Sequence, residues 1–530
     1  MFTVALVVLT LGAVFSFKFR PLGLVGAVVA LLLGLYACSS FHYGVFIFAI
    51  GLVNLLSLGA LDSRIKGVDY GLVGLMALVT MYIFNTSDFA LVLAALVLVS
   101  VPTYILVMLR DVEGNGEGKG EGVRKGEGVR GEGVRGEGGA NVEVGIKYIT
   151  FMVLATVLFL IGAVILAYTK SAFDGFLYVL GYVLLVLGLC IEVGVAPMHE
   201  WVPDVFAAAD PIPISIIASL AKIVPFVAAL FILIYTACPL TASVSIFTAV
   251  LAAVSMFTGN IGALTSKEPA RVLGYSTVAN MGYVLACLVV AAKPEFFYFA
   301  LTGGLILLFA NAAGKIGFFN AIKGGGAYSP LVYLLAFSFI GVPPLMGFWG
   351  KLFILLSLAE MQYYWLIGVL VVNSAISIPY YIRLAGELGS ATGWETNLTN
   401  IVCVAVVVLT FVTVFFVPVE WFFANMQAVA ETIGIGAGVV GVGVQQNPAD
   451  LFPVGGEAVA VGGGEPADRT PEIHASDAVF WIYVYVYGCG ADFRCPAPAL
   501  RLPDYRFHSP SAARSAAPRS CDLGGLQGGS

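Results

Sequence analysis

The stretch PIPISIIASLAKIVPFVAALFILIYT, residues 211–236, decides the fold, because one charged side chain, Lys222, lies inside an otherwise apolar run. A membrane-spanning helix needs about 20 mostly apolar residues at a rise of about 1.5 Å each. In lipid, only a helix or a closed barrel pairs all of its backbone polar groups. The stretch therefore predicts a transmembrane helix that carries a lysine in its interior.

Apolar runs of similar length recur along residues 1–423. The expected spans are 1–17, 21–38, 43–60, 69–86, 88–109, 147–169, 174–197, 211–236, 240–264, 273–292, 297–322, 327–356, 362–387 and 400–423. A membrane β-barrel would show short strands of alternating polarity, whereas these runs are long and continuous. The pattern predicts an all-α polytopic membrane protein with about fourteen transmembrane helices.

Composition supports lipid as the solvent. Hydrophobic residues make up 59% of the chain, charged residues 11%, and the mean hydropathy is +0.96. Soluble domains average about 25% charged residues. No basic patch with interleaved aromatic residues indicates nucleic-acid binding. The eight cysteines lack metal-ligand spacing and the chain has only four histidines, so we expect no cofactor or metal in this chain.

Basic residues between the expected spans predict the orientation. One side of the membrane receives Lys18, Arg20, Arg64, Lys66, Arg110, Lys147, Lys267, Arg271, Lys323 and Arg383. Only Lys170 and Lys293 fall on the other side. Cytoplasmic loops carry the excess of lysine and arginine, so the first side is expected to be cytoplasmic and both chain ends to face outward.

The sequence divides into four expected segments. Residues 1–110 form helices one to five, and residues 147–423 form helices six to fourteen with the functional core. Between them, residues 111–146 are rich in Gly, Glu and Arg and repeat Gly-Glu-Gly-Val-Arg three times, which predicts a cytoplasmic loop. Residues 424–530 are of low complexity and are expected to be a disordered tail.

Polar motifs punctuate the apolar pattern in a fixed order. They are Pro197-Met-His-Glu-Trp-Val-Pro-Asp204, Arg271-Val-Leu-Gly-Tyr-Ser-Thr277, Asn311-Ala-Ala-Gly-Lys315 and Gly341-Val-Pro-Pro-Leu-Met-Gly-Phe-Trp-Gly-Lys351. Together, over residues 88 to 390, they resemble the antiporter-like proton-translocating subunits of respiratory complex I. The family includes relatives in Mrp cation/proton antiporters and membrane-bound hydrogenases. The ending Gly-Phe-Trp-Gly-Lys at 347–351 is similar to the N-type subunit.

The resemblance implies two inverted repeats of five helices, each with one broken helix, at spans seven and twelve. Pro197 and the pair Pro343-Pro344 agree with breaks at those places. It also implies a multi-pass subunit in the cell membrane, with other membrane-arm subunits and the lipid bilayer as partners. Such a subunit belongs to an oxidoreductase of the NADH/quinone type while binding no redox centre itself.

Buried ionisable residues favour a transport function independently of the resemblance. Lys222, Lys315 and Lys351 each lie inside an apolar run, where a lysine at the bilayer centre costs about 2.5–3.5 kcal/mol. Burial and neighbouring charges can tune such a side chain to exchange protons. Glu192 precedes Lys222 by thirty residues, and we expect a direct pair between the two side chains. The predicted proton relay is therefore Glu192, Lys222, Lys315 and Lys351.

Several positions depart from the family pattern. Val97 stands where the family carries a glutamate, Glu192 where it carries a lysine, and Asn311 where it carries a histidine. One alternative is therefore a membrane-arm scaffold that does not pump. Another is a subunit of a cation/proton antiporter or of a membrane-bound hydrogenase. The sequence leaves open the electron donor and acceptor, and whether sodium replaces the proton.

Overall fold

A computed structural model describes residues 1–38, 41–64, 67–108, 137–293, 296–390 and 394–415. The repeats of the expected loop and the whole expected tail, 424–530, lie outside these residues. Helix α6 begins at Glu137, so it takes in the last ten residues of the segment that the sequence analysis assigned to the loop.

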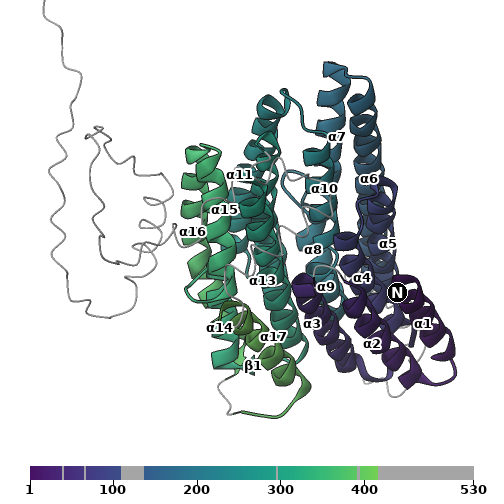
Figure 1. Ribbon diagram of the computed structural model, residues 1–530. Coiled ribbons are helices and arrows are strands. Elements are labelled where there is room, and N and C mark those ends of the chain that lie inside the picture. The colour runs from purple at the N-terminus through teal and green to yellow at the C-terminus, as the bar shows by residue number, and fades with distance from the viewer. Residues whose placement is uncertain (39–40, 65–66, 109–136, 294–295, 391–393, 416–530) are drawn as a thin grey trace, which may run out of the picture. The chain divides into compact units, whose positions relative to one another are not determined.

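The N-terminal part is helical. Its elements are α1 (Phe2–Phe15), α2 (Arg20–Ala37), α3 (Phe41–Ser57), the 3₁₀ helix η1 (Leu58–Arg64), α4 (Gly67–Tyr82), η2 (Ile83–Asn85) and α5 (Phe89–Met108). Helices α1, α2 and α4 pack closely on one another (Figure 1). Gly12 and Gly26 let α1 and α2 approach, since a Cβ added at either residue would lie 2.8 Å from the other's Cα.

The next segment supplies the first half of the core. It contains α6 (Glu137–Ser171), α7 (Gly175–Val193), α8 (Trp201–Ala208), α9 (Pro211–Ser219) and α10 (Ile223–Tyr235). Helices α6 and α7 pack along their lengths, with Gly162 and Gly188 at the contact.

The remaining helices complete the core. They are α11 (Thr241–Thr265), α12 (Pro269–Ala286), the 3₁₀ helix η4 (Cys287–Ala292), α13 (Phe297–Lys323), α14 (Ser329–Ile340), α15 (Met346–Glu360), α16 (Tyr364–Leu388) and α17 (Leu398–Phe415). Two short strands, β1 (Ala327–Tyr328) and β2 (Gly389–Ser390), pair in parallel. Helix α13 is central, since it packs on α3, α9, α12, α14, α15 and α17.

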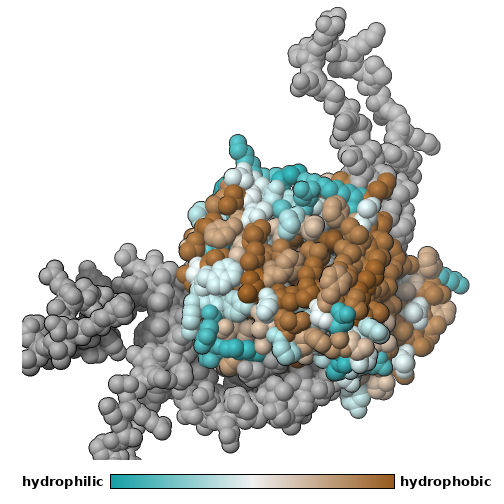
Figure 2. Space-filling model, turned by 90° about the horizontal axis from the view of Figure 1, so that it is seen from above, coloured by the Kyte–Doolittle hydropathy of each residue, from teal (hydrophilic) through white to brown (hydrophobic). Residues whose placement is uncertain are grey.

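Hydropathy confirms the all-α membrane fold class. Eleven helical segments of the described residues are long and apolar enough to span a membrane, and three shorter apolar helices accompany them. Many large hydrophobic side chains lie on the surface, among them Val7, Phe17, Leu98 and Val164, as expected for contact with lipid. Figure 2 shows hydrophobic residues over much of the face seen there. The count of fourteen spans and the inverted repeats stay predictions.

Two helices end where the sequence has glycine and proline. Helix α7 ends at Val193, and Gly194 follows with φ of +81°. Helix α14 ends at Ile340, and Gly341 follows with φ of +93°. Glycine is the residue that adopts this left-handed conformation without a steric cost, so it terminates helices.

The expected span 211–236 is not one continuous helix. It divides into α9 and α10, with a turn at residues 220–222. Pro225 accounts for the turn, because a proline has no N–H to donate to the carbonyl four residues earlier, that of Ala221, and its ring clashes with that carbonyl. The break places Lys222 where backbone groups are not all paired within a helix.

Candidate functional site

Lys222 lies at the break between α9 and α10 and is 2% exposed. Its Nζ donates to two main-chain carbonyls at the end of α7, those of Glu192 at 3.1 Å and Val193 at 3.0 Å. The last carbonyls of a helix lack partners within the helix and carry the negative end of its dipole. The ammonium also lies 4.9 Å from the centre of the Trp201 ring. Lys222 therefore caps the end of α7.

Glu192 is 8% exposed and lies one residue before the end of α7. Its Oε1 accepts a hydrogen bond of 2.6 Å from the Ser100 hydroxyl of α5, and its Oε2 is buried with no hydrogen-bond partner among the described residues. The expected direct pair with Lys222 is wrong, because the lysine binds the Glu192 carbonyl instead of its carboxylate. The carboxyl group is instead hydrogen-bonded to α5.

Lys351 repeats the arrangement of Lys222 on α15. It is 1% exposed, and its Nζ donates to the carbonyls of Phe339 at 3.0 Å and Ile340 at 2.8 Å, the last two residues of α14. The centre of the Tyr283 ring lies 5.1 Å from this nitrogen. Lys351 therefore caps α14 as Lys222 caps α7.

Lys315, on α13, is fully buried. Its Nζ donates to the Leu273 carbonyl at 2.5 Å and to the Ser276 hydroxyl, both on α12. The centre of the Phe339 ring lies 5.3 Å from the Lys315 nitrogen. The main-chain carbonyl of the same residue binds Lys351. Lys315 and Lys351 thus contact the same residue, Phe339.

Asn311 connects α13 to the other half of the site. Its amide nitrogen lies 3.4 Å from the Ala218 carbonyl, four residues before Lys222, and Asn311 itself lies one turn before Lys315. Asn311 thus links α13, which carries Lys315, to α9, which ends beside Lys222. Val97, where the family pattern has a glutamate, is 37% exposed and does not line the site.

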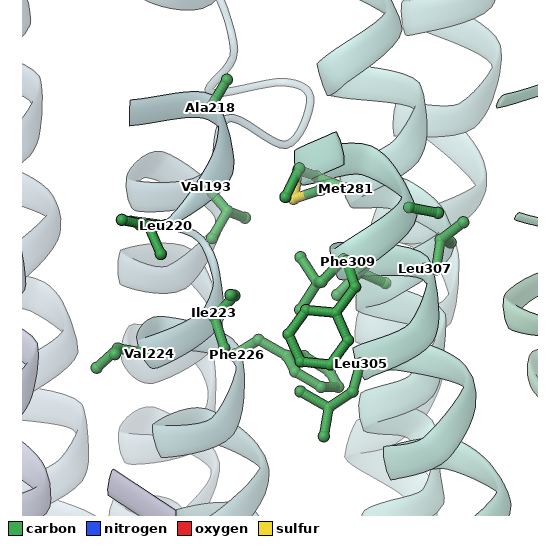
Figure 3. Packing of buried hydrophobic residues seen from close by; sticks show 14 of the residues in the cluster. Val193, Ala218, Leu220, Ile223, Val224, Phe226, Met281, Leu305, Leu307 and Phe309 are labelled. Atoms are coloured by element: carbon green, nitrogen blue, oxygen red, sulfur yellow. The ribbon is translucent and has the colours of Figure 1, made fainter. Parts of the chain in front are cut away.

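Apolar side chains fill the space around the break at Lys222. Figure 3 shows Leu220, Ile223 and Phe226 on one side, and Met281 and Phe309 of α12 and α13 on the other. All five are buried. The polar groups of the site are therefore separated by packed hydrophobic residues, so transfer of a proton along it needs either side-chain movement or water.

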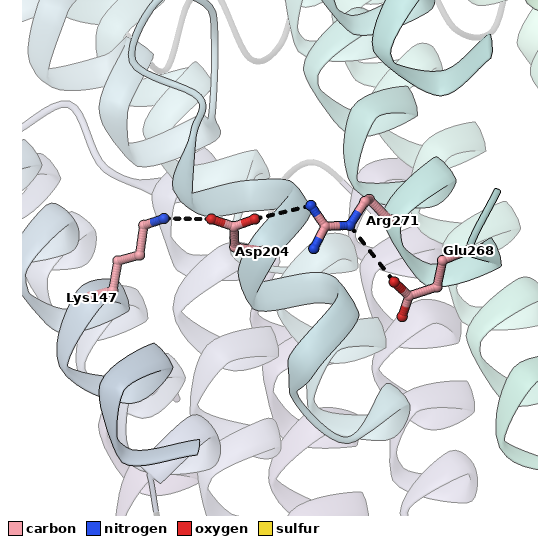
Figure 4. A network of polar contacts seen from close by, with 4 residues as sticks. All are labelled: Lys147, Asp204, Glu268 and Arg271. Carbon is pink, nitrogen blue, oxygen red and sulfur yellow. Dashed lines mark hydrogen bonds and ion pairs between the residues drawn. The ribbon is translucent and has the colours of Figure 1, made fainter. Parts of the chain in front are cut away.

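The ion pairs of Asp204 and Asp210 lie at one end of the helices. The Asp204 carboxylate forms ion pairs with Lys147 at 2.5 Å and with Arg271 at 3.2 Å, and Arg271 also pairs with Glu268 (Figure 4). Lys323 pairs with Asp210 at 2.6 Å. Lys147, Arg271 and Lys323 belong to the set of basic residues that the sequence places on the cytoplasmic side. We call this end of the molecule the basic end.

The sequence analysis missed three partners of the site residues. Ser100, Ser276 and Tyr283 hold or face Glu192, Lys315 and Lys351. Ser276 lies in the quoted motif 271–277, but no partner was assigned to it, because the sequence does not say which hydroxyl group faces a buried lysine. The residues that the structure describes contain no group of three or more His, Cys, Asp or Glu side chains that could hold a metal ion.

Comparison with known proteins follows this geometry. Residues 134–377 match the family described as NADH:quinone oxidoreductase/Mrp antiporter, transmembrane. The NADH-quinone oxidoreductase subunit N 2 of Solidesulfovibrio magneticus is 31% identical over 269 residues, which are 46% of this chain and 57% of that relative. The chain thus spans less than two thirds of the length of this curated relative.

Solved structures share the fold. A chain of respiratory complex I from Thermus thermophilus superposes with a TM-score of 0.56 at 24% identity, covering 82% of this chain and 98% of that one. A chain of the Mrp complex from Dietzia superposes with a TM-score of 0.63 at 16% identity, covering 83% and 98%. Both are parts of multi-subunit membrane complexes. This multi-pass membrane protein therefore carries, in residues 134–377, the transmembrane domain of the NADH:quinone oxidoreductase/Mrp antiporter family.

Proposed function

We propose that the chain is a proton-translocating membrane-arm subunit of a complex I-like oxidoreductase in the cell membrane. Glu192, Lys222, Lys315 and Lys351 form its proton relay. Electron transfer takes place in other subunits, and this chain binds no redox cofactor. Its similarity to subunit N supports the assembly, and the buried lysines support the activity.

One observation carries the proposal: each of the three buried lysines has two oxygen acceptors and no carboxylate within 4.0 Å among the described residues. An ammonium group has three N–H donors, whereas a neutral amine has two and a free lone pair. Two acceptors therefore hold the nitrogen in either protonation state, and the third proton can leave without breaking the helix cap.

Phe339 suggests how the second half of the relay works. Its carbonyl binds Lys351 and its ring faces Lys315, so both ammonium groups contact one residue. Two like charges so placed in a medium of low dielectric repel each other. Arrival of a proton at one lysine therefore favours its release from the other, which gives the relay a direction once either end is coupled to a redox event.

Glu192 would act at the start of the relay. One carboxyl oxygen is held by Ser100 and the other has no partner among the described residues. An ionisable side chain inside a membrane span is costly, and such groups in membrane proteins mark ion pathways and proton relays. The acid can then hand its proton toward Lys222, which binds the carbonyl of the same residue.

The test is proton pumping in sealed membrane vesicles that contain the assembled complex. Lys351→Met and Lys222→Met remove the titratable nitrogen, and an apolar side chain at these depths does not oppose insertion. We expect both variants to assemble and to lose proton pumping, measured as acidification with a pH-sensitive dye.

Lys147→Met is the matched control, because Lys147 is partly exposed in the basic-end ion-pair network. It should pump as the unaltered protein does. Normal acidification by an assembled Lys351→Met complex would contradict the relay and favour the scaffold. Sodium-dependent transport in its place would favour the cation antiporter.

A further inference from the structure

Three buried asparagines of the core each have an amide oxygen without a hydrogen-bond donor among the described residues. They are Asn54 of α3, and Asn311 and Asn320 of α13. Each is at most 1% exposed. A buried amide oxygen without a donor costs about 1–3 kcal/mol in free energy, so such groups are usually satisfied by protein or by water.

Two of these amides have their orientation fixed by their neighbours. Asn54 contacts the Ser219 hydroxyl at 2.9 Å, and Ser219 donates its own proton to the Ile216 carbonyl. A hydroxyl that has donated its proton can only accept, so the Asn54 NH₂ group must face Ser219. The Asn54 oxygen is therefore the free end of this amide.

The same argument applies to Asn320. Its nitrogen donates to the Ser57 hydroxyl at 3.1 Å and to the Ile316 carbonyl at 2.8 Å. Ser57 gives its proton to the Val53 carbonyl. Rotating the Asn320 amide by half a turn would place its oxygen against two acceptors, so the oxygen is again the free end.

These residues follow one another from the basic end into the core. The Asp210–Lys323 pair lies partly exposed at the basic end, and Asn320 lies three residues before Lys323 on α13. Asn320 contacts Ser57 of α3, and Asn54 lies three residues before Ser57 on the same face of that helix. Asn54 in turn contacts Ser219, the last residue of α9, which lies three residues before Lys222.

We propose that the interface of α3, α9 and α13 binds a file of water molecules that leads from the Asp210–Lys323 pair to Lys222 and delivers protons to it. The free oxygens of Asn320 and Asn54 each accept a hydrogen bond from one of these waters. The free oxygen of Asn311, whose amide nitrogen lies 3.4 Å from the Ala218 carbonyl of α9, accepts one from a further water. The role of this water file in proton transport rests on the proposed function. Its location rests on the amide oxygens that lack a donor among the described residues. It assigns a transport function to α3, outside the matched residues 134–377.

The competing explanation is that these amides only join helices, as polar side chains do in membrane proteins. Both accounts predict that the amide nitrogens matter for packing. Only the water file needs the free oxygens, and only it predicts access from the aqueous phase at the basic end.

The first experiment measures proton pumping by Asn54→Leu and Asn320→Leu in the assembled complex. We expect the pumping rate per complex to fall at least about tenfold, which corresponds to losing roughly one hydrogen bond. Asn373→Leu is the control, since Asn373 is a buried amide whose nitrogen donates to Val369 and whose oxygen accepts from Asn260. It should lower stability without a comparable loss of pumping.

The second experiment does not depend on activity. In full-length chain whose native cysteines are replaced, Asn54→Cys and Asn320→Cys should react with Ag⁺ added at the basic end of the membrane. Ala77→Cys, at a fully buried apolar position of α4, should not react. Reaction would be read as the loss of later labelling by a thiol reagent after denaturation.

The outcomes separate this inference from the proposed function. If Lys351→Met stops pumping while Asn54→Leu and Asn320→Leu pump like Asn373→Leu and their cysteines stay unreactive, the water file is wrong and the relay stands. If Lys351→Met pumps normally, the relay fails. Ag⁺ reactivity then still decides whether the interface is hydrated.

Discussion

The ends of α7 and α14 are built alike and yet differ in one group. In both, a left-handed glycine and the residue after it donate their N–H groups to one carbonyl, that of Cys190 at the end of α7 and that of Phe337 at the end of α14. In both, a buried lysine from another segment takes the last two carbonyls. Only the end of α7 also carries a buried carboxyl, Glu192.

The comparison separates capping by a buried lysine from the role of the carboxyl group. Capping is common to both ends and satisfies helix carbonyls that lipid cannot satisfy. The carboxyl is found at one end only, so capping does not need it. The relay proposed above uses this carboxyl group as a proton carrier.

The largest stability effect is expected from the two glycines. At Gly194, a Cβ would lie 2.3 Å from the Val202 Cγ2 atom, and the left-handed conformation adds about 1–2 kcal/mol for a non-glycine residue. Gly341→Ala should cost at least the conformational part, about 1–2 kcal/mol, because Gly341 has φ of +93°. Thermal unfolding of the purified protein should show a larger loss for Gly194→Ala than this conformational cost alone. Val202→Ala should rescue part of the Gly194→Ala loss, and the absence of any rescue would contradict the contact with Val202.

The next effect concerns the caps themselves. Lys222→Met leaves two buried carbonyls without a donor, whereas Lys222→Gln retains an amide N–H that can reach one of them. An unsatisfied buried group costs about 1–3 kcal/mol, so the glutamine variant should be the more stable by about that amount. The same order is expected for Lys351. If methionine and glutamine gave equal unfolding temperatures, the lysines would not be caps.

Glu192→Gln should have a smaller effect on stability, below about 1 kcal/mol, because the amide oxygen can still accept the Ser100 hydrogen bond. Proton pumping should nevertheless be lost, since an amide does not titrate. A stability loss of about 3–5 kcal/mol would instead identify the carboxylate as half of a buried ion pair.

The smallest effect is expected at the basic end. Asp204→Asn removes the centre of a network whose side chains are about one third to one half exposed, and exposed ion pairs contribute about 0–1 kcal/mol. The variant should pump normally, and added salt should reduce the small stability difference from the unaltered protein. Loss of pumping would show that Asp204 belongs to the proton path.

Sequence predicted the helical membrane fold and the burial of Lys222, Lys315 and Lys351, because a charge inside an apolar run is visible without a structure. It did not predict the break before Ile223, although Pro225 carried that signal. Hydropathy also cannot say which neighbour a side chain faces. For that reason the carboxylate of Glu192 was expected at Lys222 but lies at Ser100, and Asn54 and Asn320 were not singled out.

The most direct test of the relay is the ratio of protons pumped to electrons transferred by an assembled Lys351→Gln complex in sealed vesicles. Glutamine keeps a donor for the end of α14 but cannot take up or release a proton near neutral pH, so it separates the cap from the carrier. We expect the variant to assemble with near-normal stability and to pump far fewer protons per electron, or to slow both processes together where coupling is tight. An unchanged ratio at an unchanged rate would contradict proton transfer through Lys351.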